Sequence, residues 1–157
     1  MNDPKHIDNW RRYNARLTTS GQPTEKQLID IQKLGVSHVI NLGMNTHERA
    51  LPDEAASTTK LGMTYIYIPV DFDNPKETDF EQFVKTFSAL DKAVVHVHCI
   101  ANLRVTAFFY RYHRDVLGND ETKAFKIMDT VWRPGGVWAK FIDDESSVKL
   151  PHSRKSS

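Results

Sequence analysis

The chain has 157 residues, which suits one domain with a hydrophobic core and does not require a second. Its 21 Lys and Arg balance 20 Asp and Glu, so the overall charge gives no preference for nucleic acid or an acidic membrane. The polar N-terminus, the lack of a membrane-spanning apolar run and the single cysteine predict a cytoplasmic protein with neither membrane nor nucleic-acid partners. The oligomeric state is left open.

Helices and strands alternate along the chain. Residues 17–22 are polar and turn-like, and a helix is predicted from Thr24, which has capping-box spacing to Gln27, up to Gly35. A second capping box is predicted at Thr78. Apolar periodicity then predicts strands at 36–42, 63–68 and 93–98, and helices at 53–60, 78–90, 102–116, 119–131 and 137–142.

This alternation predicts an α/β fold: a single three-layer domain with a mainly parallel central sheet flanked by helices. We expect the domain to cover residues 1–146, followed by a polar C-terminal tail at 147–157.

Cys99 ends the most apolar predicted strand and directly precedes a predicted helix. Ligands of such folds collect beyond the carboxyl ends of the strands. At a strand-to-helix turn, backbone N–H groups converge and the helix dipole favours negative charge, which stabilises a nucleophilic thiolate. Arg104 could offer a planar fork of donors to two phosphoryl oxygens. These residues predict a phosphate-binding loop with a nucleophile at its floor.

A displacement at this loop would form a cysteinyl-phosphate that water then hydrolyses. The leaving oxygen needs a proton, so a carboxylic acid has to approach from a second loop. The loop at 71–75 follows a neighbouring strand and contains Asp71 and Asp73. A turn-forming role is the alternative for either aspartate.

The segment from His98 to Thr106 resembles the signature loop of the cysteine-dependent protein tyrosine phosphatases, especially the small dual-specificity type. Residues 20–23, 35–42, 61–69 and the acid loop follow in the order seen in compact bacterial members, so the resemblance covers about residues 17–116. It implies a dual-specificity phosphatase-like fold and an enzyme that acts on a phosphorylated protein or a small phosphomonoester.

The resemblance also implies a role for each matching residue. Cys99 would be the nucleophile, Arg104 the phosphate-binding arginine and Asp71 the general acid, with Asp73 as second choice. His98 would orient the loop. Substrate would be bound by the loop residues Ile100, Ala101, Asn102, Leu103 and Arg104.

The loop departs from the family pattern at one point. Four residues separate Cys99 from Arg104 where the family has five, and Asn102 replaces the usual glycine. An ungapped alignment keeps Thr106 as the hydroxyl that assists the thiolate but puts Val105 at the arginine position. Arg104 is then either rotated away by about 100°, or it faces inward from a loop one residue tighter. The alternative function is therefore that of a pseudophosphatase, which binds phosphate or a phosphorylated partner without turnover.

Several of these residues also have a purely structural alternative. Cys99 could be a small core residue, Arg104 a salt-bridge partner, and Thr106 a helix residue that bonds back to a carbonyl. His96 and His98 project to the same face of a strand and, with Cys99, would suit a metal-dependent hydrolase. Because no second motif with metal-ligand spacing accompanies them, we expect core histidines, no metal and no cofactor.

Overall fold

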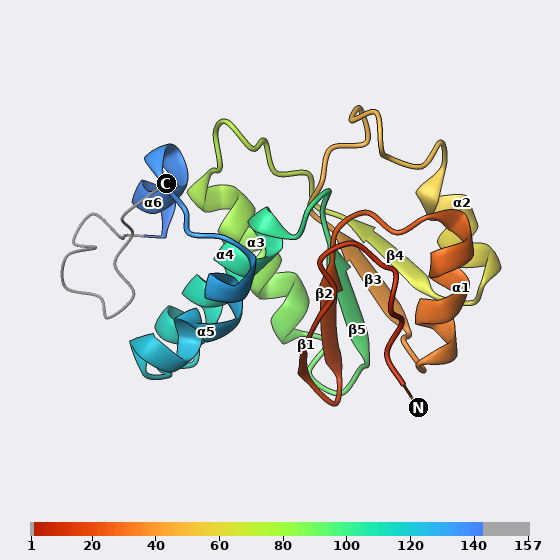
Figure 1. Cartoon of the computed structure of the whole chain (residues 1–157), viewed down its shortest axis with the longest axis horizontal. Coiled ribbons are helices and arrows are strands. Elements are labelled where there is room, and N and C mark those ends of the chain that lie inside the picture. The colour runs from red at the N-terminus through yellow and green to blue at the C-terminus, as the bar shows by residue number, and fades with distance from the viewer. Residues whose placement is uncertain (1, 143–157) are drawn as a thin grey trace.

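A five-stranded sheet runs through the middle of the protein, with helices on both of its faces (Figure 1). The computed structural model describes residues 2–142, so the predicted tail at 147–157 lies outside the described residues. The strands are β1 (Arg11–Asn14), β2 (Leu17–Ser20), β3 (His38–Asn41), β4 (Thr64–Tyr67) and β5 (Val95–His98). Their order is β1-β2-β5-β3-β4, and only the β1–β2 pair is antiparallel. The predicted, mainly parallel sheet is confirmed.

The helices cover the sheet in two groups. They are α1 (Glu25–Lys33), α2 (Glu54–Lys60), α3 (Glu77–Ser88), α4 (Leu103–Arg111), the π-helical turn η1 (Tyr112–Val116), α5 (Glu121–Val131) and α6 (Gly136–Phe141). In Figure 1, α1 and α2 lie on one side of the sheet and α3 to α6 on the other. The three-layer α/β prediction is therefore confirmed, and none of these helices is long and apolar enough to cross a membrane.

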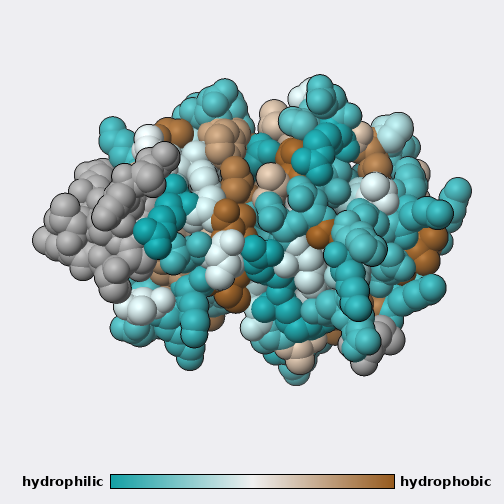
Figure 2. All heavy atoms as spheres, in the orientation of Figure 1, coloured by the Kyte–Doolittle hydropathy of each residue, from teal (hydrophilic) through white to brown (hydrophobic). Residues whose placement is uncertain are grey.

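Two hydrophobic clusters fill the space between the layers. The larger one includes Phe83, Phe108 and Phe109 from α3 and α4, and the smaller one includes Leu28 and Ile31 from α1. On the face shown in Figure 2 the surface is mostly hydrophilic and hydrophobic atoms form small patches. The apolar faces of the helices are thus buried in the core.

The prediction that residues 17–22 form a turn is wrong for residues 17–20. These residues form β2, which pairs in parallel with β5 and is buried along its whole length. Their hydroxyl groups are satisfied inside the protein: the Thr18 and Ser20 Oγ atoms each lie 2.8 Å from a ring nitrogen of His96. A polar strand can therefore be buried here, because its partner strand supplies the hydrogen bonds.

Helix starts and ends differ from the predictions in two places. Helix α3 begins at Glu77 and not after a Thr78 cap, because the Asp79 carboxylate accepts a hydrogen bond from the Lys76 backbone N–H at 3.2 Å. The helix predicted at 102–116 is α-helical only to Arg111 and continues as the π-helical turn η1.

Candidate active site

The loop that begins with Cys99 lies at the centre of the sheet. Strand β5 is flanked by β2 and β3, and His98 at its end pairs in register with Ser20 and Asn41. The Cys99 N–H donates to the Ser20 carbonyl at 3.3 Å, after which the chain turns into α4 at Leu103. The predicted strand-to-helix turn is therefore present at the carboxyl edge of the parallel strands.

Four consecutive carbonyl groups of the loop lie within hydrogen-bond distance of other groups of the protein. The acceptor and donor atoms are Cys99 O with His98 Nδ1 (3.0 Å), Ile100 O with Gln22 N (3.0 Å), Ala101 O with Asn9 Nδ2 (2.9 Å) and Asn102 O with Thr106 Oγ1 (2.9 Å). In a trans peptide the C=O and the following N–H point in opposite directions. The amides of residues 100–103 therefore point to the opposite side from these partners. No protein acceptor is found for these amides among residues 2–142. Such an arrangement suits an anion.

Asn102 gives the loop its shape. Its backbone is left-handed, with φ 67° and ψ 14°, at the residue that precedes α4. Asparagine tolerates this region better than most residues, as expected for a substitute for glycine. Its side-chain amide donates to the Asn9 carbonyl at 2.8 Å and to Thr19 Oγ1 at 3.0 Å. The side chain thus ties the loop to the N-terminal segment and to β2.

A cavity of about 320 Å³ opens in front of the loop. It is lined by Cys99, Ile100, Ala101, Leu103 and Arg104 together with His47, Phe72 and Asp73. Cys99 is 1% exposed and therefore lies at its floor. Arg104 lines the same cavity, whereas Val105 is fully buried in the larger hydrophobic cluster. Of the two orientations left open by the sequence, the geometry corresponds to the inward-facing Arg104.

Arg104 also contacts the loop that carries the two candidate acids. Its Nη1 donates to the Val70 carbonyl at 2.8 Å, and its guanidinium carbon lies 5.6 Å from the centroid of the Phe72 ring. The Phe72 carbonyl in turn accepts a hydrogen bond from Trp138 Nε1 at 2.7 Å. The arginine and the acid loop are therefore positioned together.

The two aspartates of this loop have different surroundings. The Asp71 carboxylate accepts a hydrogen bond from the Asp73 backbone N–H at 2.9 Å, and Asp71 is not among the residues that line the cavity. Asp73 does line it. The first-choice acid therefore shapes a turn, and the second-choice acid shares a cavity with Cys99.

Thr106 bonds back to the preceding turn. Its hydroxyl donates to the Asn102 carbonyl at 2.9 Å and accepts from Trp132 Nε1 at 3.1 Å. It is not among the residues lining the cavity. This is the helix-residue alternative, in place of assistance to the thiolate.

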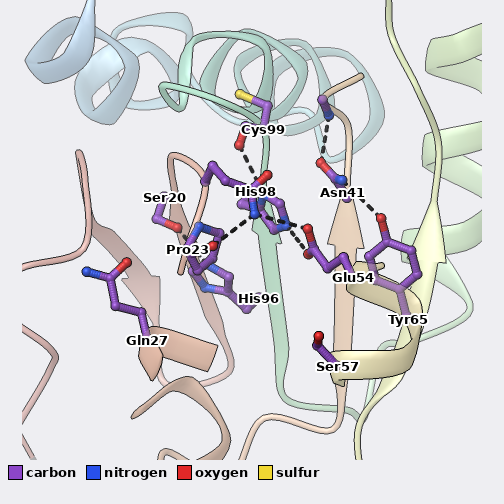
Figure 3. Close-up of polar contacts among 12 residues, drawn as sticks. Ser20, Pro23, Gln27, Asn41, Glu54, Ser57, Tyr65, His96, His98 and Cys99 are labelled. Carbon is purple, nitrogen blue, oxygen red and sulfur yellow. Dashed lines mark hydrogen bonds and ion pairs between the residues drawn. The ribbon is translucent and has the colours of Figure 1, made fainter. Parts of the chain in front are cut away.

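A buried ion pair lies behind the loop (Figure 3). His98 Nε2 is 2.5 Å from Glu54 Oε2, and the two side chains are 0% and 5% exposed. Gln22 Nε2 donates to the other carboxylate oxygen at 3.0 Å. Burial pushes the pKa of Glu54 up, but the charge of His98 and the hydrogen bonds from His98 and Gln22 outweigh it and hold this pKa below its usual value.

The other strand histidine does not complete a metal site. Both ring nitrogens of His96 bond to hydroxyl groups of β2, and its ring stacks on Trp10 with 5.0 Å between centroids. Burial, helped by the charge of His98, lowers the pKa of His96 well below its usual value. Within residues 2–142, no group of three His, Cys, Asp or Glu side chains is placed to hold a metal. The metal-hydrolase alternative has no support in this geometry.

No family model matches the chain. A crystal structure from Shewanella putrefaciens CN-32, named a putative phosphatase (DUF442), is 32% identical and superimposes with a TM-score of 0.78. The alignment covers 92% of this chain and 94% of that one. The chain belongs to the DUF442 phosphatase-like family.

Two more distant proteins are similar to part of this chain. P. aeruginosa TpbA, solved in complex with pTyr, is 20% identical over 77% of this chain and 72% of that chain, with a TM-score of 0.64, and shows the same fold. A beta-lactamase hydrolase-like protein of Xylella fastidiosa (strain Temecula1 / ATCC 700964) is 28% identical over 99 residues, or 61% of this chain. The match spans 23% of that relative's length.

Several residues that support the loop of this DUF442 protein were not predicted. Asn9 and Gln22 hold loop carbonyls, and Glu54 pairs with His98. Gln22 belongs to a segment that matched the family pattern, which was a signal without an assigned role. Glu54 has no motif around it, and its partner is 44 residues away in sequence.

Proposed function

We propose that this protein is a cysteine-dependent phosphatase that hydrolyses a phosphomonoester through a cysteinyl-phosphate. The observation that carries the proposal is the shared cavity of Cys99 and Arg104, which opens at the start of α4 where the loop amides have no acceptor within residues 2–142. The thiolate would attack phosphorus, and the guanidinium and loop amides would stabilise the charge on the phosphoryl oxygens. The Cys-x4-Arg loop is, in this proposal, a working phosphate-binding loop one residue tighter than the usual signature.

Proton transfer is assigned to Asp73. In the first step the sulfur–phosphorus bond forms, the phosphorus–oxygen bond breaks, and the Asp73 carboxyl gives its proton to the leaving oxygen. In the second step the Asp73 carboxylate takes a proton from the water that attacks phosphorus, and the thiolate of Cys99 leaves. Asp73 lines the cavity, whereas Asp71 is engaged in the turn, and this supports Asp73 over Asp71.

The cavity walls favour a substrate with a flat, apolar leaving group. Phe72, Ile100 and Leu103 contribute apolar side chains to the lining. Phe72 continues into an aromatic cluster, with ring centroids 6.0 Å from Trp132 and 5.7 Å from Trp138. An aryl phosphate, free or on a phosphorylated protein, suits these walls, and the TpbA complex with pTyr supports the same class.

Binding without turnover is the second candidate function. It is favoured by one observation: a guanidinium nitrogen of Arg104 already donates to the Val70 carbonyl, so part of the fork is engaged with protein. A pseudophosphatase would bind phosphate at the loop and leave the ester intact.

Turnover of p-nitrophenyl phosphate and calorimetric binding of vanadate separate these functions. We expect turnover that disappears in Cys99→Ser, and a fall of about 10²-fold or more in kcat for Asp73→Asn, with a much smaller effect for the matched Asp71→Asn. Vanadate binding with no turnover between pH 5 and 8 would support the pseudophosphatase. A protein that neither turns over p-nitrophenyl phosphate nor binds vanadate would contradict both functions.

A further inference from the structure

The ion pair behind the loop is connected to two successive loop carbonyls. His98 Nδ1 lies 3.0 Å from the Cys99 carbonyl oxygen, and the Gln22 backbone N–H donates to the Ile100 carbonyl at 3.0 Å. The side chain of Gln22 also holds the carboxylate of Glu54. In Figure 3 the His98 ring points toward Glu54 while the sulfur of Cys99 points away from this pair.

The hydrogen-bond partners determine where the protons of His98 lie. A carbonyl oxygen only accepts, so Nδ1 has to donate to the Cys99 carbonyl. The second nitrogen, Nε2, faces a carboxylate oxygen at 2.5 Å, which also accepts. Donation from both nitrogens would make the ring an imidazolium, with its positive charge directly behind the residue that bears the thiol.

We propose that Glu54 is a positioning residue for the cysteine site: its carboxylate, held by Gln22, keeps His98 doubly protonated. The imidazolium then both fixes the Cys99 carbonyl and stabilises the adjacent thiolate. The proposal rests on the proposed function only in taking Cys99 as the reactive group. Glu54 itself has no place among the residues that line the cavity.

The other titratable groups near the pair do not take over this role. His96, two residues earlier on β5, has ring nitrogens that already face the β2 hydroxyls, and its lowered pKa keeps it neutral. Tyr65 of β4 bonds to Asn41, and burial together with the nearby Glu54 raises its pKa, so it remains a neutral phenol. Asp53 caps α2 by accepting from the Ala56 N–H. Glu54 is therefore the anion in contact with His98.

Glu54→Gln is a sharp perturbation because every hydrogen bond has a replacement. The amide can donate to Nε2 of a neutral His98, which still donates from Nδ1 to the Cys99 carbonyl, and Gln22 can still donate to the amide oxygen. The variant thus removes the charge and keeps the shape. Glu25→Gln is the matched control, since Glu25 is the first residue of α1, as Glu54 is of α2, and is exposed.

The test is the rate of Cys99 alkylation by iodoacetamide as a function of pH, which requires no phosphatase turnover. We expect the midpoint of the profile to rise by about one pH unit in Glu54→Gln, with a roughly tenfold slower reaction at pH 6. Glu25→Gln should match the wild type. In a His98→Asn background, Glu54→Gln should have no further effect on the midpoint. An unchanged midpoint in a folded Glu54→Gln protein would reduce Glu54 to a structural residue and overturn the proposal.

A second measurement needs no variant. Nitrogen-15 NMR of the wild-type His98 ring should show both nitrogens protonated at pH 7, and an unprotonated Nε2 would overturn the proposal. Failure of the proposed function is distinguishable, because a protein without turnover can still give the alkylation profile and the NMR signature.

Discussion

Gly21 offers the most direct way to move the loop at 99–104 without changing a residue that lines the cavity. A Cβ at this position would lie 2.5 Å from the Ile100 carbonyl oxygen and 3.2 Å from the Ala101 Cα, and both are backbone atoms. To reach an ordinary contact the loop would have to retreat by roughly 0.5 to 0.9 Å, because backbone cannot rotate away as a side chain can. A misplacement of about 1 Å at a reacting centre can cost 10²-fold in rate. We therefore expect Gly21→Ala to lower kcat/KM for p-nitrophenyl phosphate by roughly 100-fold, with a parallel loss of vanadate affinity.

Two other glycines serve as graded controls. A Cβ at Gly43 would lie 3.2 Å from Ile100 Cδ1 and from Asn41 Oδ1 and 3.3 Å from the Cys99 carbonyl carbon. None of these is as close as the 2.5 Å at Gly21, so Gly43→Ala should give a smaller loss of activity. Gly62 has φ +83° and no heavy atom within 4 Å of an added Cβ, so Gly62→Ala should cost about 1–2 kcal/mol of stability and leave kcat/KM unchanged. Urea unfolding of each variant separates stability from activity. A folded Gly21→Ala protein with kcat/KM within threefold of the wild type would refute the inferred contact between Gly21 and the loop.

Three further changes test other contacts. Arg104→Lys loses the planar fork and should lower kcat/KM by about 10²–10³-fold, with weaker vanadate binding by calorimetry; retained affinity would contradict the proposed role. Trp138→Phe removes the donor to the Phe72 carbonyl and should cost about 1 kcal/mol in urea unfolding, with a several-fold loss of kcat; no change in either would show that this bond does not hold the acid loop. The pKa of His96 is depressed in the folded protein, so the unfolded chain binds an extra proton below about pH 6.5. The free energy of unfolding is therefore highest above that pH and falls as pH decreases through it, by up to about 1.4 kcal/mol per pH unit. Urea titrations between pH 7.5 and 5.5 should show this slope, and His96→Asn should reduce it by one proton.

The layers of the fold and the place of Cys99 could be predicted because they depend on local patterns. Apolar periodicity identified the helices, and the strand-to-helix change at Cys99 is visible within a few residues. Strand β2 was missed because its hydroxyls looked solvated. Their partner, His96, is 78 residues from Thr18 in sequence, so the hydrogen bonds that permit burial become visible only once the two strands are paired.

The details of the candidate site depended on backbone conformations that spacing does not determine. Arg104 lies in the first turn of α4, which begins at Leu103 after the left-handed Asn102, and it lines the cavity. The choice between Asp71 and Asp73 depends on a two-residue turn in which one aspartate caps the other's backbone N–H. Glu54 was missed because a buried carboxylate is read as an exposed helix start until its partner is known.

In the proposed phosphate-binding loop, other residues of this chain support the short Cys-x4-Arg spacing from several sides. Asn9 and Gln22 hold two carbonyls from outside the loop. On the far side, Arg104 is tied to Val70 and packs on Phe72, so the acid loop is part of the same unit. A loop with one residue fewer has less freedom to adapt to its ligand, so its amides have to be placed correctly before an anion arrives. We therefore expect that loosening any one of these supports weakens vanadate binding even where Cys99 and Arg104 are untouched.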